Sequence, residues 1–95
     1  MLFMTVFTYE PHARDEVIRR RVEKGAMVPN GMKLLGEWSH VGSGRVFRLI
    51  DVEDAAVLPE ASMPWTDIGS LDVYPVMEVE KMLPRLKDRL AAAAS

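Results

Sequence analysis

One short segment near the start of the chain constrains the fold most strongly. Residues 2–9 read Leu-Phe-Met-Thr-Val-Phe-Thr-Tyr, a run of β-branched and aromatic residues that favours an extended strand. Successive side chains of a strand point to opposite faces, yet here both the even-numbered and the odd-numbered positions are mostly apolar. This pattern predicts a strand that is covered on both faces.

The segments that follow predict a helix and then a hairpin. Pro11 suits the first turn of a helix, where its missing N–H has no partner to lose, and Gly25 suits the end of that helix. Residues 32–41 and 45–52 are rich in strand-forming side chains and are separated by Gly42-Ser43-Gly44. A glycine-rich break between two such runs indicates a β-hairpin.

The second half of the chain predicts a short helix, a strand and a longer helix. Pro59 lies in the middle of residues 53–63, so a helix there should be short, kinked or broken. Pro75 places the strand predicted over residues 71–77 at a sheet edge, because proline cannot donate to a ladder. The last helix is predicted over residues 78–90, and its apolar side chains recur at helical spacing on one face. They are Val79, Met82, Leu83, Leu86 and Leu90.

The order of these elements is β-α-β-β-α-β with an added C-terminal helix. This order predicts an α+β, ferredoxin-like fold with a four-stranded antiparallel sheet, in which the first and third strands are central. A chain of 95 residues suits one domain, which we divide into a core over residues 1–77, the helix over 78–90 and a frayed tail over 91–95.

The same fold predicts a partner for the sheet. In a two-layer ferredoxin-like fold the helices cover one face of the sheet and the other should be polar, but the first and third strands are apolar on both faces. Monomers rarely expose an apolar face of that size. We therefore expect a homodimer in which the two sheets face each other, a dimeric α+β barrel. A monomer at micromolar concentration would contradict this expectation.

Several segments together resemble a known family. They are the opening strand into Tyr9-Glu10-Pro11, residues 31–40 with Leu34-Leu35-Gly36-Glu37-Trp38, the turn Gly42-Ser43-Gly44-Arg45, and the stretch from Trp65 to Val73-Tyr74-Pro75-Val76. In these segments the chain resembles an uncharacterised family of short bacterial proteins that carry a domain of unknown function, placed in the dimeric α+β barrel group. The resemblance covers roughly residues 1–77 and implies this fold and a dimer. It implies no reaction and no catalytic residues.

Composition excludes several classes of function. The chain is 48% apolar and 27% charged with a formal net charge of -2, which gives no long-range attraction to nucleic acid or to anionic lipid. It has no cysteine, which excludes disulfides and thiolate metal sites, and no apolar run as long as a membrane span. We expect no cofactor, no nucleic-acid partner, no membrane partner and, in the absence of a signal peptide, a cytoplasmic location.

The hairpin carries one candidate ligand site. Trp38 and His40 share a strand face, and Arg48 joins them if the turn has three residues but joins Glu37 if it has two. Trp38, His40 and Arg48 around a cavity are suited to a planar anionic or aromatic molecule. The alternative is that Trp38 packs at an interface, Arg48 pairs with Glu37, and His40 is a solvated residue.

A candidate catalytic group comprises Tyr9, His12 and Asp72, which we expect at one end of the sheet together with Asp51. A tyrosine, a histidine and a carboxylate within hydrogen-bond reach can perform acid–base chemistry. Alternatively, Asp51 caps a helix and Asp72 is an exposed strand residue. We expect His12 and His40 at opposite ends of the sheet, roughly 25 Å apart, so that they share no metal within one chain.

These observations leave the function open. The first hypothesis is a homodimer that binds an apolar or aromatic small molecule or serves as a structural module. The alternative is a cofactor-independent oxygenase or isomerase that acts on a small aromatic or polyketide-like metabolite between the sheet and the helices. The sequence does not decide whether the protein is an enzyme.

Overall fold

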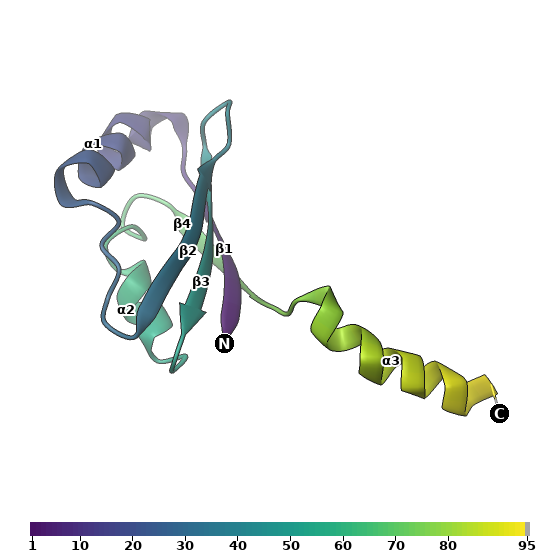
Figure 1. Cartoon of the computed structure of the whole chain (residues 1–95). Helices are drawn as coiled ribbons and strands as arrows, with labels where there is room; N and C mark the ends of the chain where they lie inside the picture. Colours follow the sequence, from purple (N-terminus) through teal and green to yellow (C-terminus); the bar gives the residue numbers. More distant parts are fainter. Residues whose placement is uncertain (95) are drawn as a thin grey trace.

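A four-stranded antiparallel sheet forms the centre of the protein, whose structure is a computed structural model that describes residues 1–94 (Figure 1). The strands are β1 (Leu2–Thr8), β2 (Met32–Ser39), β3 (Arg45–Val52) and β4 (Ser70–Val76). Their order in the sheet is β2-β3-β1-β4, so β1 and β3 are central, as the element order predicts. The protein therefore has the predicted α+β, ferredoxin-like fold.

Two helices cover one face of this sheet and a third leaves it (Figure 1). A 3-10 turn, η1 (Pro11–Ala13), leads into α1 (Arg14–Lys24), and α2 (Val57–Ser62) connects β3 to β4. The third helix, α3 (Val79–Ala94), follows β4 and extends away from the sheet. Gly25 ends α1 as predicted, because its φ of 73° turns the chain out of the helix while its N–H bonds to the carbonyl of Arg21 at 3.1 Å.

The helix after β3 is short, as Pro59 predicts, but its cap differs from the expected one. Pro59 lies in the first turn of α2, where a backbone N–H has no helical partner to lose. The N-cap residue of α2 is Ala56, which makes no side-chain capping bond, and the carboxylate of Asp54 accepts the N–H of Ala56 at 2.9 Å in the turn before the helix. Asp51, the expected cap, lies within β3 and instead accepts a hydrogen bond from the amino terminus of Met1 at 2.9 Å.

The buried core lies between the sheet and α1 and α2. The odd-numbered residues of β1 are buried, and its two phenylalanines belong to two separate clusters. Phe3 packs with Ile50 and Val52 at one end of the sheet, and Phe7 packs with Trp65 and neighbours at the other.

The opposite face of the sheet, here called the open face, has no helix of the same chain over it (Figure 1). The register of the strands places its apolar side chains in one group. The group comprises Leu2, Met4 and Val6 of β1, Phe47 and Leu49 of β3, Trp38 of β2, and Tyr74 and Val76 of β4. Those of the central strands are half-buried and the others are exposed.

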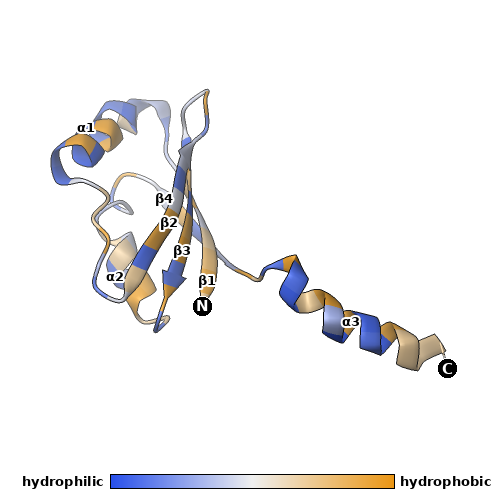
Figure 2. Cartoon of the chain, viewed as in Figure 1, coloured by the Kyte–Doolittle hydropathy of each residue, from blue (hydrophilic) through white to orange (hydrophobic). Residues whose placement is uncertain are grey.

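The C-terminal helix is longer than predicted. It runs to Ala94 and includes Pro84, so residues 91–94, which we expected to fray, are helical. The last residue of the expected tail, Ser95, lies outside the described residues. All of α3 is exposed, including its apolar stripe (Figure 2). The stripe comprises Val79, Met82, Leu83, Leu86 and Leu90.

Candidate functional site

A cavity of about 320 Å³ lies between the sheet and the helices, near the low end of the size of small-molecule sites. Its lining is mainly apolar and comes from all four strands, from α1, from α2 and from the segment after α2. The lining residues used below are Thr5, Phe7, Tyr9, Arg21, Glu37, Arg48, Ala61 and Trp65.

Aromatic rings form one wall of this cavity. The ring of Phe7 lies 5.9 Å from that of Tyr9 and 6.0 Å from that of Trp65, centroid to centroid, and both pairs are tilted. Such distances are typical of attractive aromatic pairs. The rings come from a central strand and from the loop before β4, so their mutual packing fixes that loop against the sheet.

Three charged side chains form the polar part of the wall. Arg48 of β3 donates its Nε–H to Glu37 of β2 at 2.7 Å, and Arg21 of α1 donates to the other oxygen of the same carboxylate at 2.9 Å. The guanidinium carbon of Arg48 also lies 5.7 Å from the ring centroid of Trp65, a cation–π distance. Two cations thus share one anion beside an aromatic surface, which leaves one positive charge in excess.

The charge of Glu37 is maintained by these two arginines. Burial alone would raise the pKa of its carboxyl, but the hydrogen bond from Arg21 and the nearby charge of Arg48 outweigh burial and lower it. Glu37 is therefore ionised at neutral pH, and the trio keeps its excess positive charge.

Trp65 has an unsatisfied polar atom. The residue is 8% exposed, and its buried indole Nε1–H has no hydrogen-bond acceptor among the described residues. A buried donor without a partner costs about 1–3 kcal/mol. Thr5, also buried, lines the same cavity and supplies a hydroxyl from the centre of the sheet.

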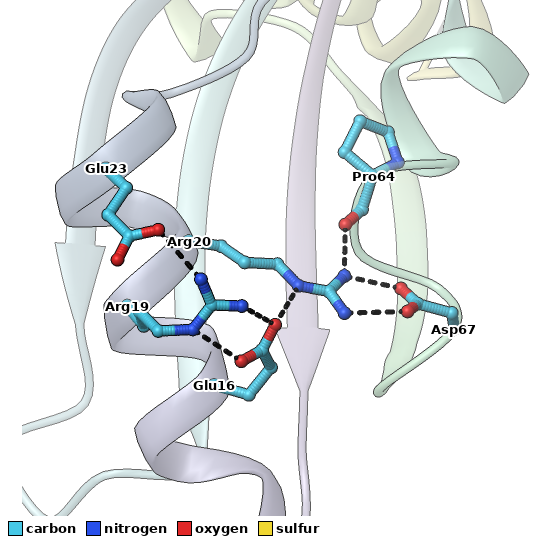
Figure 3. A network of polar contacts seen from close by, with 6 residues as sticks. All are labelled: Glu16, Arg19, Arg20, Glu23, Pro64 and Asp67. Atoms are coloured by element: carbon cyan, nitrogen blue, oxygen red, sulfur yellow. Dashed lines mark hydrogen bonds and ion pairs between the residues drawn. The ribbon is translucent and has the colours of Figure 1, made fainter.

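A second arginine network positions the segment that carries Trp65 (Figure 3). Arg20 of α1 donates to the carbonyl of Pro64 at 2.8 Å and forms a bidentate pair with Asp67 at 2.7 and 2.8 Å. These bonds hold the residues on both sides of Trp65 against α1. The fork of guanidinium donors matches a carboxylate, which makes this pair geometrically specific.

Glu16 completes this network on the α1 side. It accepts hydrogen bonds from Arg19 and from Arg20, and these bonds lower the pKa of its carboxyl to about 2. The hydrogen bond from Arg20 lowers the pKa of Asp67 as well. Glu16 and Arg20 form an ion pair at the i,i+4 spacing, which favours such pairs on a helix. Arg19 forms ion pairs with both Glu16 and Glu23.

The structure does not bring the three predicted ligand residues together. Trp38 pairs with Phe47 and lies on the open face, 54% exposed. Arg48 pairs with Glu37 on the helix-covered face and lines the cavity, which is the alternative that the sequence left open. His40 is exposed in the hairpin, where its Nδ1 accepts the N–H of Gly42 at 3.2 Å.

The predicted catalytic residues are not brought together either. Tyr9 lines the cavity, and its hydroxyl shares a hydrogen bond of 3.1 Å with that of Ser43. His12 is exposed in η1, and Asp72 pairs with Val6 and so lies on the open face. Asp51 pairs with Leu2 at the far end of the sheet, so the expectation that it joins the others was wrong.

The expected separation of the two histidines was also wrong. Because β1 and β3 are antiparallel, the end of β1 meets the start of β3, and Tyr9 donates its N–H to the carbonyl of Gly44 in the hairpin at 3.0 Å. His12 and His40 therefore lie at the same end of the sheet. Within residues 1–94, no three histidine or carboxylate side chains gather to hold a metal ion.

Three residues of the site were missed by sequence reasoning. Trp65 lies in a segment without periodicity, which hides its burial. Arg21 could have been identified, since it stands four residues after Val17 and thus on the apolar side of α1. Glu37 was considered only as a partner of Arg48.

No helix among the described residues is long and apolar enough to cross a membrane.

Comparisons with known proteins give the family of the chain. No curated protein matches the sequence. Residues 1–90 match the model of a family described as a domain of unknown function (DUF3303), and the chain therefore belongs to this family.

Proposed function

We propose that this protein binds a small, mainly apolar molecule in the cavity between the sheet and the helices. The observation that carries the proposal is the cavity itself, about 320 Å³ in volume and lined by apolar side chains together with a few polar groups. This combination is typical of ligand sites, in which apolar walls supply affinity and a few polar groups supply orientation.

A cofactor-independent oxygenase or isomerase has less support. Of Tyr9, His12 and Asp72, only Tyr9 lines the cavity, so the acid–base group expected from the sequence is not assembled around a substrate there. Binding without catalysis is the function that the geometry favours.

Filling the cavity tests this proposal. Ala61 of α2 lines the cavity, whereas Ala56, just before α2, is exposed and outside it. Ala61→Phe should abolish or strongly weaken the binding of a planar probe, 2-naphthamide, in isothermal titration calorimetry, and Ala56→Phe should leave it unchanged. Equal binding of the probe to both variants would contradict the proposal, as would a native protein that binds neither this amide nor the carboxylate of the same shape, 2-naphthoate.

We further propose that the protein functions as a homodimer. The open face and the stripe of α3 are both apolar and uncovered, and in a soluble monomer surfaces of this kind are small. A second copy supplies both a matching sheet face and a matching helix, and twofold dimers are the commonest assemblies. The sheet-to-sheet arrangement leaves the cavity on the outer, helix-covered side of each sheet.

Absolute mass from light scattering on a sizing column tests the dimer. The native protein should have twice the mass of the 10.7 kDa chain. Phe47→Lys, which places a charge on the open face, should shift it to the monomer, whereas Val41→Lys in the exposed hairpin should not. A native mass of 10.7 kDa would contradict the dimer but not ligand binding.

A further inference from the structure

The polar part of the cavity wall distinguishes between kinds of ligand. Glu37 satisfies part of each guanidinium: Arg48 uses Nε and Nη2, and Arg21 uses Nε and Nη2. Within residues 1–94, the Nη1 group of each arginine has no hydrogen-bond partner. The wall thus retains unused donors as well as its excess positive charge.

The position of these donors matters as much as their charge. Arg21 comes from α1 and Arg48 from β3, and their shared carboxylate holds the two guanidinium groups close together. Arg48 is mostly buried and lies over the ring of Trp65, so its charge is less screened by water than that of a surface arginine. A neutral ligand would leave this charge unmatched, and a cationic one would be repelled.

We infer that the cavity selects a planar, mainly apolar molecule that carries one anionic group, such as an aromatic carboxylate, and that Arg21 and Arg48 bind this group. The aromatic wall of Phe7, Tyr9 and Trp65 holds the ring system. An oxyanion accepts charge-assisted hydrogen bonds from the unused guanidinium donors, and these are stronger than bonds between neutral groups. This inference rests on the proposed function and adds the charge of the ligand to it.

A pair of probes of the same shape tests the inference. The probes are 2-naphthoate, which is an anion, and 2-naphthamide, which is its neutral counterpart, and their dissociation constants are measured by calorimetry at pH 7. The native protein should bind the carboxylate about tenfold more tightly than the amide, since one charge-assisted interaction is gained.

Three variants separate charge from shape. Glu37→Gln keeps the side-chain shape and an oxygen that accepts hydrogen bonds from the guanidinium groups but removes the shared negative charge, so it should tighten 2-naphthoate binding at least severalfold, and by a larger factor than it changes the binding of the amide. Arg48→Met should remove the preference for the anion. Arg14→Met makes the same change in charge on the solvent side of α1, where Arg14 forms its one ion pair within residues 1–94 with Asp15, and should have no effect.

Each outcome either supports or overturns the inference that the cavity selects an anionic ligand. A gain in affinity in Glu37→Gln cannot come from unfolding, and retained binding of the amide by Arg48→Met shows that its cavity is intact. Equal affinities for the two probes, or no gain in Glu37→Gln, would overturn the inference and leave the proposed function standing. If neither probe binds to the native protein, the proposed function fails, and the inference fails with it.

Discussion

Replacement of Val52 by alanine measures how tightly the core is packed at the end of the sheet. Val52 is 1% exposed and packs with Phe3 and Ile50 beneath α2. The substitution removes two buried carbon atoms, which costs about 1.6 kcal/mol at the free energy of transfer of a methylene group. Incomplete closure of the resulting space adds up to about 1 kcal/mol, so the free energy of unfolding should fall by about 1.6–2.6 kcal/mol.

The assay is urea unfolding, followed by tryptophan fluorescence at one protein concentration. Val41→Ala is the matched control, because Val41 is fully exposed in the hairpin and its loss should change the stability by less than about 0.5 kcal/mol. A loss below about 1 kcal/mol in Val52→Ala, or equal losses in the two variants, would refute the assignment of this cluster to the core.

Three further predictions concern the segment around Trp65 and the charge network beside it. Gly69→Ala should destabilise the fold by about 1–3 kcal/mol in the same assay, since a Cβ there would lie 2.5 Å from the Phe7 ring and 2.6 Å from the Thr8 carbonyl oxygen. Trp65→Phe removes the unpartnered N–H and should cost less than the about 3–5 kcal/mol of Trp65→Ala; equal losses would contradict an unsatisfied donor. The folded protein lowers the pKa of the Glu16 carboxyl from 4.5 to about 2, so between these values it binds fewer protons than the unfolded chain. The contribution of Glu16 to the urea midpoint should therefore be constant above about pH 4.5 and should be lost as the pH falls towards 2. Glu16→Gln should flatten that dependence, and an unchanged slope would contradict the role of this carboxylate.

Most of the fold could be predicted because its signals are local. Pro11 begins the 3-10 turn that leads into α1, Gly25 ends α1, and Pro59 accounts for the shortness of α2. Pro75 identified an edge strand before any pairing was known. The strand order followed from the order of the elements. The extension of α3 to Ala94 was missed, although alanine is the best helix former and the segment contains no residue that would stop the helix.

The site depended on pairing that the sequence does not contain. The residue of β2 that shares a face with Arg48 is set by the loop length of the hairpin, which pairs Arg48 with Glu37, and an irregularity between Leu34 and Gly36 then sets the face of the residues at the start of β2. Such details shift a whole strand from one face to the other. The ends at which His12 and His40 lie follow from the antiparallel pairing of β1 with β3, and neglect of that pairing separated them wrongly.

The most direct test of ligand binding in the cavity uses the two tryptophans, which lie on opposite faces of the sheet. Trp65 is part of the cavity wall, and Trp38 is exposed on the open face. In protein labelled with ¹⁵N at tryptophan, with signals assigned from a Trp38→Phe variant, titration with 2-naphthamide should shift the indole N–H signal of Trp65 and leave that of Trp38 in place. A shift of the Trp38 signal alone, or of neither signal, would contradict the cavity as the binding site.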